Sequence, residues 1–169
     1  MSIARRSALL SGARLLFGGS LAALATACSR AGAATPATKE TFEVVMTDEQ
    51  WKAKLSPRAY AVLRHEGTET PFTSPLNDEH RKGTFSCAGC ALALFSSETK
   101  FDSHTGWPSF WQPLPKAVSQ MQDTSLGMSR DEVHCRRCGG HLGHVFDDGP
   151  KPTGLRYCMN GVAMAFTPA

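Results

Sequence analysis

From Thr84 onward the chain consists of short segments in which apolar residues alternate with polar ones or run together. Glycine, proline, aspartate and serine bound these segments, which is typical of β-strands. Between them lies no segment of helical length with helical periodicity. We therefore predict a small, mainly β domain whose strands are mostly antiparallel, located at Thr84–Cys87, Leu92–Ser96, Val118–Asp123, Glu132–Cys135, His144–Phe146, Arg156–Asn160 and Val162–Phe166.

Two short helices are predicted ahead of the strands. Thr47-Asp48-Glu49-Gln50 has the pattern of a capping box, which opens a helix by satisfying its first backbone N–H groups. Ser56-Pro57 opens a second helix, with serine as N-cap and proline at the first helical position. Gly67 is placed to end this helix, and the proline- and aspartate-containing segment Thr70–Gly83 is predicted to be a loop.

The first 27 residues are typical of an export signal. Arg5, Arg6 and Arg14 precede the apolar stretch Leu15–Ala27, which ends in small residues. The stretch is too short for a permanent membrane-spanning helix. The adjacent pair Arg5-Arg6 favours the twin-arginine type of signal. We predict that residues 1–27 form a signal peptide.

Cys28 directly follows the predicted signal. Ala25-Thr26-Ala27-Cys28 partly matches a bacterial lipoprotein processing site, and Ala31-Gly32-Ala33 offers cleavage without lipidation as the alternative. Residues 28–43 are predicted to be a linker because they are rich in alanine, threonine and proline. We expect an exported, periplasmic protein, with a lipid anchor at Cys28 favoured, and one folded domain over residues 44–169.

Removing the signal changes the charge balance of the chain. The signal carries three of the 18 basic residues and none of the 15 acidic ones, so residues 28–169 hold 15 of each sign. A balanced domain offers no basic surface for a phosphate backbone, which excludes nucleic acid as a partner. The domain is long enough to bury its own core, and we expect a monomer.

Four of the six cysteines form two C-x-x-C pairs. Cys87-Ala88-Gly89-Cys90 and Cys135-Arg136-Arg137-Cys138 have the spacing of metal knuckles, and glycines stand where each chain must turn back. Four thiolate ligands leave no open coordination position on a tetrahedral metal. We therefore expect one structural zinc ion per chain and no organic cofactor. Iron in the same cage, or two disulfides, are the alternatives.

Cys158 is the cysteine without a structural partner. It lies in Arg156-Tyr157-Cys158-Met159-Asn160, where Arg156 and Asn160 share its face if the segment is a strand. A nearby cation favours the reactive thiolate over the thiol. We interpret Cys158 as a nucleophile; the alternative is a buried structural cysteine, the commoner role of a lone thiol.

Three motifs together resemble the B-type methionine-R-sulfoxide reductases: Gly106-Trp107-Pro108-Ser109-Phe110, the segment His141–Pro150, and Arg156–Asn160. The match extends over Val44–Phe166, in the family's order and with both knuckles. The resemblance implies two antiparallel sheets with a structural zinc away from the active site. It also implies a thiol-dependent oxidoreductase that reduces the R epimer of methionine sulfoxide, mainly in peptides and proteins, as a repair enzyme in the response to oxidative stress.

The same resemblance assigns roles to single residues. Cys158 would attack the sulfoxide sulfur, and the departing oxygen needs protons from an acid near neutral pH, a role suited to histidine. His141 and His144 occupy the matching positions; surface residues or a second metal site are the alternatives. The remaining histidines are interpreted as surface residues: His65, His80, His104 and His134. His104 is the one exception worth keeping, because it lies three residues before Trp107.

Four further site residues follow from the resemblance and the strand pattern. Arg156 would favour the Cys158 thiolate, and Asn160 would organise the site from behind. Trp107 would form the wall of a pocket for the substrate's methyl group, with Phe110 beside it as a second substrate-binding residue. The alternatives are solvation of a strand face for the polar pair and core packing for Trp107.

One departure from the family concerns regeneration of the enzyme. Many members carry a resolving cysteine directly before Gly-Trp-Pro, but here Thr105 occupies that position. Cys158 would be left as a sulfenic acid, and Cys28 is the one other cysteine outside the knuckles. We therefore expect direct reduction by an external thiol, such as a thioredoxin-like protein.

A non-catalytic module is the competing class. A rubredoxin-like iron protein or a zinc-ribbon interaction domain would account for the four knuckle cysteines. Neither explains Arg156–Asn160 or the paired histidines.

Overall fold

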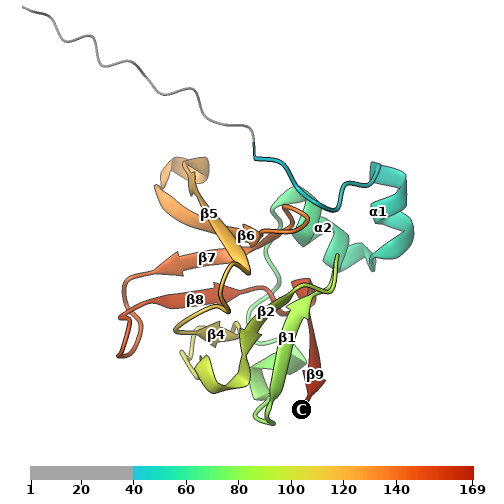
Figure 1. Cartoon of the computed structure of the whole chain (residues 1–169). Helices are drawn as coiled ribbons and strands as arrows, with labels where there is room; N and C mark the ends of the chain where they lie inside the picture. Colours follow the sequence, from blue (N-terminus) through green and yellow to red (C-terminus); the bar gives the residue numbers. More distant parts are fainter. Residues whose placement is uncertain (1–39) are drawn as a thin grey trace, which may run out of the picture. The chain divides into compact units, whose positions relative to one another are not determined.

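The computed structural model describes residues 40–169, and the predicted signal peptide, Cys28 and most of the predicted linker lie outside the described residues. Within the described range, nine strands form two antiparallel sheets, as predicted from the sequence (Figure 1). The first sheet has the order β2-β1-β9 and the second the order β3-β4-β8-β7-β6-β5. The strands are β1 Gly83–Cys87, β2 Ala93–Ser96, β3 Lys100–Phe101, β4 Ser109–Phe110, β5 Val118–Asp123, β6 Arg130–Cys135, β7 His141–Phe146, β8 Arg156–Met159 and β9 Met164–Pro168.

Both predicted helices are present, α1 at Asp48–Lys54 and α2 at Pro57–His65. Both halves of the predicted capping box form at Thr47, and the Ser56 side chain accepts a hydrogen bond at the start of α2. Helix α2 packs against β7 and against the short 3-10 helix η4, Gly161–Ala163. No helix among residues 40–169 has the length and apolar character needed to cross a membrane.

The buried core includes an aromatic cluster where the two sheets meet. Phe85 and Phe95 come from the small sheet, and Phe110 and Tyr157 from the large one. The rings of Phe95 and Phe110 stack with their centroids 4.3 Å apart, and Phe85 meets Phe110 edge to face at 4.9 Å. Burying each of these side chains contributes about 2 kcal/mol, and the ring pairs add about 1 kcal/mol each. The contact between the sheets is therefore a substantial apolar source of stability.

Alternation along the large sheet separates the core from a polar face. On β8, Tyr157 and Met159 are buried in the core, while Cys158 lies on the opposite side and is partly exposed. The register pairs Cys158 with His144 on β7 and with Ser109 on β4, and it pairs His144 with Glu132 on β6. The polar face of the large sheet thus brings together the chemically active side chains of four strands.

Two details differ from the sequence prediction. The prediction does not include strands β3 and β4, because they have two residues each and carry no detectable alternation, and Pro108 directly precedes β4. The predicted strand Val162–Phe166 begins instead within η4 and becomes a strand from Met164 onward. The turn arises because the Ala163 N–H donates to the Asn160 carbonyl at 3.1 Å.

Candidate active site and metal centre

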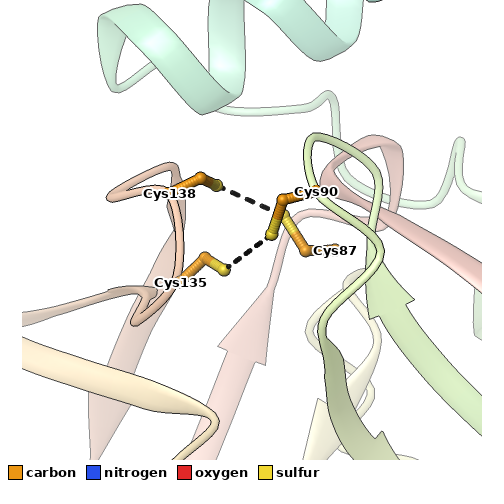
Figure 2. A group of neighbouring side chains, drawn as sticks. All are labelled: Cys87, Cys90, Cys135 and Cys138. Atoms are coloured by element: carbon orange, nitrogen blue, oxygen red, sulfur yellow. Dashed lines mark hydrogen bonds between the residues drawn. The ribbon is translucent and has the colours of Figure 1, made fainter. Parts of the chain in front are cut away.

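The four knuckle cysteines come together at one end of the two sheets (Figure 2). Their sulfur atoms all lie within 4.8 Å of one another. The Sγ atoms of Cys87 and Cys138 are 3.7 Å apart, and those of Cys90 and Cys135 are 3.5 Å apart. A tetrahedral metal with bonds of about 2.3 Å to sulfur requires edges of about 3.8 Å, whereas a disulfide requires about 2.05 Å. The geometry therefore fits a metal ion and not the alternative of two disulfides.

The two knuckles have the same backbone structure. In the first, the Cys87 carbonyl accepts from the Ala91 N–H and the Cys87 N–H donates to Leu92, both at 2.8 Å. In the second, Cys135 makes the equivalent bonds with Gly139 and Gly140, also at 2.8 Å. Each turn thus aims two sulfur atoms at the same point.

The thiols of this cluster cannot all ionise without a cation. Hydrogen bonding with Cys135 raises the pKa of Cys87, whereas hydrogen bonding with Cys135 lowers the pKa of Cys90. A bound metal removes this conflict because it holds every ligand as a thiolate. Since Cys87 ends β1 and Cys135 ends β6, the metal would tie the small sheet to the large one.

Cys158 opens into a pocket on the polar face. The pocket has a volume of about 130 Å³, and its lining includes Trp107, His144, Phe146 and Asn160. Gly143, beside His144 on β7, has φ +155°, and a Cβ there would lie 2.1 Å from the Cys158 carbonyl oxygen. Glycine at this position is what allows β8 to approach β7 so closely.

His144 is held by a carboxylate that sequence reasoning did not identify. Its Nε2 atom lies 2.8 Å from Oδ2 of Asp123, which also accepts from Arg130 at 2.6 Å. Burial lowers the pKa of His144, while the hydrogen bond to Asp123 opposes this effect. The pKa of Asp123 is held well below its usual range by hydrogen bonds from Ser125 and then from His144.

His141 is also paired with a carboxylate, and it is more deeply buried than His144. It is 4% exposed, and its Nδ1 atom lies 2.6 Å from Glu132 Oε1. This hydrogen bond from His141 lowers the pKa of Glu132. The two imidazole rings meet edge to face with their centroids 5.4 Å apart. His144 therefore lines the pocket beside Cys158, and His141 supports it from the interior.

Arg156 and Asn160 lie where the strand pattern predicts but have different partners. The Arg156 guanidinium makes two bonds of 2.8 Å to Asp148 and lies over the Phe146 ring at 4.4 Å. The ion pair with Asp148 raises the pKa of Arg156, and the Cys158 sulfur adds to this effect. Asn160 is buried and donates to the Leu142 carbonyl at 3.0 Å.

The side chains of Trp107 and Phe110 lie on opposite sides of the large sheet. Trp107 lines the Cys158 pocket, and its Nε1–H donates to the Glu69 carbonyl at 2.8 Å. Phe110 is fully buried between Phe85 and Phe95 and does not line that pocket. The structure gives Phe110 a core-packing role instead of the expected substrate contact, because its side chain points to the core face of β4.

Thr105 lies beside the sulfur of Cys158. Its Oγ1 atom is 3.7 Å from Sγ, and it shares a hydrogen bond of 2.8 Å with Ser103. Ser103 in turn bonds Ser109 at 2.7 Å, and Ser109 donates to the Trp107 carbonyl at 3.1 Å. A chain of hydroxyl groups therefore occupies the surroundings of the nucleophile where the family often places a second thiol.

His134 corrects the interpretation of the remaining histidines as surface residues. It is 4% exposed, its Nε2 atom lies 2.8 Å from Glu40 Oε2, and Phe42 packs edge-on against its ring. The last residues of the predicted linker, Glu40 and Phe42, thus contact the folded domain.

Comparison with known proteins identifies the class to which this fold and site belong. The SelR domain matches residues 55–168, so the chain belongs to the SelR domain family. A relative named peptide methionine sulfoxide reductase MsrB from Leptospira interrogans is 53% identical over 126 residues, which cover 74% of this chain and 96% of the relative.

Two further relatives carry the same name. The protein from Bradyrhizobium diazoefficiens is 53% identical over 133 residues, covering 78% of this chain and 96% of its own. The protein from Thioalkalivibrio sulfidiphilus is 55% identical over 125 residues, covering 73% and 91%. These matches confirm the resemblance that the motifs indicated and argue against the non-catalytic module.

The metal centre yields a prediction about stability. Replacing Cys135 by serine should release the bound metal and lower the melting temperature by about 10 °C or more, since ligand loss removes folding free energy supplied by the metal. Cys158→Ser is the matched control, because it removes one thiol outside the cluster and should leave both quantities unchanged. Metal analysis and calorimetry measure them, and a metal-free Cys135→Ser protein with the wild-type melting temperature would contradict the structural role.

Proposed function

We propose that this protein reduces the R epimer of methionine sulfoxide in peptides and proteins to methionine. The observation that carries the proposal is Cys158 in a small pocket, facing His144 across the β7–β8 pair and walled by Trp107. The names of the relatives support the substrate class. The pocket is large enough for the methyl end of a methionine side chain and places a nucleophile beside a proton donor.

The chemistry requires one thiolate and a supply of protons. Attack by the Cys158 thiolate on the sulfoxide sulfur, with uptake of one proton, converts thiolate and sulfoxide into a sulfenic acid and a thioether. The Cys158 sulfur is oxidised by two electrons and the methionine sulfur is reduced by two. Two external thiols then restore the Cys158 thiol and form a disulfide and water.

His144 is the proposed proton donor because it lines the pocket and pairs with Cys158 across the strands. Asp123 holds its ring and favours the protonated form, against the burial that lowers its pKa. The His141–Glu132 pair would support the same face from behind. The positive charge of Arg156 lies near the Cys158 sulfur and would favour its thiolate. Asn160 would hold the backbone of β7 in place through its hydrogen bond to the Leu142 carbonyl.

Regeneration by an external thiol is supported by the placement of the cysteines. Among residues 40–169, the thiols other than Cys158 are the four of the metal cluster. A zinc ion suits that all-thiolate cluster best, and with its coordination filled it would have no catalytic position. Thr105 offers a hydroxyl in place of a resolving thiol.

The proposed reaction is tested by product analysis on separated R and S epimers of a blocked methionine sulfoxide, with dithiothreitol as reductant. The wild-type protein should consume the R epimer alone. Cys158→Ser should lose activity by at least about a thousandfold, since the nucleophile is removed. Equal consumption of both epimers, or substantial activity of the serine variant, would refute the proposal.

The acid role of His144 predicts a specific pH dependence. Asp123→Asn removes the carboxylate that opposes the effect of burial, so the pKa of His144 should fall further. The protonated imidazole then disappears at lower pH, and the single-turnover rate near neutral pH should decrease. NMR titration of the His144 ring and the single-turnover pH profile measure both changes. Asp131→Asn, at an exposed position on β6, is the control and should change neither quantity. A titration of His144 that does not move in Asp123→Asn would contradict the proposed effect of Asp123 on His144.

The hydroxyl beside Cys158 predicts how the oxidised enzyme behaves. Thr105→Cys should form a disulfide with Cys158 after one turnover without reductant, since the two side chains are in contact. The yield of the dimedone adduct of Cys158 should fall accordingly, and peptide mapping should show the new bridge. Thr105→Ser is the control and should keep the adduct of the wild-type protein. A disulfide already present in the unmodified protein would contradict the external-thiol route.

A further inference from the structure

The short 3-10 helix η1 (Pro75–Asp78) and the loop before it are joined to the Gly106-Trp107 turn by three hydrogen bonds. Trp107 Nε1 donates to the Glu69 carbonyl at 2.8 Å, the Phe72 N–H donates to the Gly106 carbonyl at 2.8 Å, and Asn77 Nδ2 donates to the same carbonyl at 3.0 Å. Gly106 has φ +94°, and a Cβ there would lie 2.7 Å from Cβ of Pro71. The loop can therefore sit this closely on the turn only because residue 106 is glycine.

Phe72 is the residue that this loop presents. Its side chain is 73% exposed although its backbone is anchored, and its φ of +64° is unfavourable for a residue with a Cβ. Such strain persists only where the surrounding structure imposes it, and it is concentrated at functional sites. An exposed aromatic ring in a strained and anchored backbone indicates a binding role, because neither its burial nor its conformation stabilises the fold.

Phe72 lines a second pocket of about 170 Å³, which Trp107 also lines. Phe101, Trp107 and Pro108 supply further apolar surface to this pocket. Three of the ionisable groups on its rim have partners within the protein. His104 pairs with Asp102 at 3.2 Å, and Lys100, whose pKa is lowered by burial, donates to the Asn77 carbonyl at 2.7 Å. Most of the apolar surface of the pocket is aromatic.

We infer that this second pocket binds an apolar side chain that neighbours the oxidised methionine in the protein substrate. Trp107 lines both pockets, so the two pockets are neighbours, and a side chain next to a methionine sulfoxide at Cys158 is within reach of the second pocket. The inference rests on the proposed function and gives it a sequence preference: sites flanked by large apolar residues are reduced faster than sites flanked by glycine. The rim carries acidic and basic groups together, so it favours neither sign of substrate charge.

The test compares two blocked peptides that carry R-methionine sulfoxide between two phenylalanines or between two glycines. Wild-type protein should show a kcat/KM about fivefold higher for the phenylalanine peptide, the value expected for partial burial of one aromatic side chain. Phe72→Ala should remove this preference by lowering the kcat/KM for the phenylalanine peptide towards that for the glycine peptide. Val45→Ala is the matched control: Val45 is 80% exposed and lines neither pocket, so the preference should persist.

Two further variants separate binding from a structural role. Phe72→Leu keeps apolar surface and should keep most of the preference. Phe72→Gly relieves the strain at φ +64° and should raise the melting temperature while it abolishes the preference. A preference that survives in Phe72→Ala and Phe72→Gly, or that is absent from wild type, would overturn the inference. Failure of the proposed function would be distinct, because wild-type protein would then reduce neither peptide.

Discussion

The structure depends on the convergence of four cysteine sulfurs at the ends of two strands. Cys87 ends β1 in the small sheet and Cys135 ends β6 in the large one, so a metal in this cluster joins the sheets across the aromatic core (Figures 1 and 2). A domain of this size has a modest core, and a structural metal adds folding free energy directly. A metal bound by all four sulfurs would have no open coordination position, so its role would be structural and not catalytic.

In the large sheet, successive side chains point alternately to the core and to the polar face, so the packing of the core also positions the active-site residues. Tyr157 and Met159 hold β8 against the core, and the residue between them, Cys158, must then face the other side. The pairing of β7 with β8 sets His144 opposite it. A slip of one residue would bury the nucleophile, so the same contacts that form the core also position the active site.

Much of this arrangement could be predicted from local sequence. The capping box at Thr47, the knuckle spacings and the polar neighbours of Cys158 are short-range patterns, and each predicts its structure directly. Asp123 and Glu132 could not be identified as partners of the histidines because their contacts depend on strand register and on an irregularity at Val133/His134. Phe110 and Phe72 have the same chemistry in sequence, yet one is fully buried and the other exposed, since only the packed structure determines which face each presents.

The central claim is that the Cys158 sulfur takes up the oxidising equivalent of the substrate, with no second thiol taking part. Quantifying methionine and protein mass after mixing the reductant-free protein with excess R-methionine sulfoxide peptide tests this most directly. The account predicts one methionine per chain and the mass of one added oxygen atom on the peptide that contains Cys158. Methionine formed together with an internal disulfide, or oxygen added to the metal-cluster cysteines instead, would contradict it.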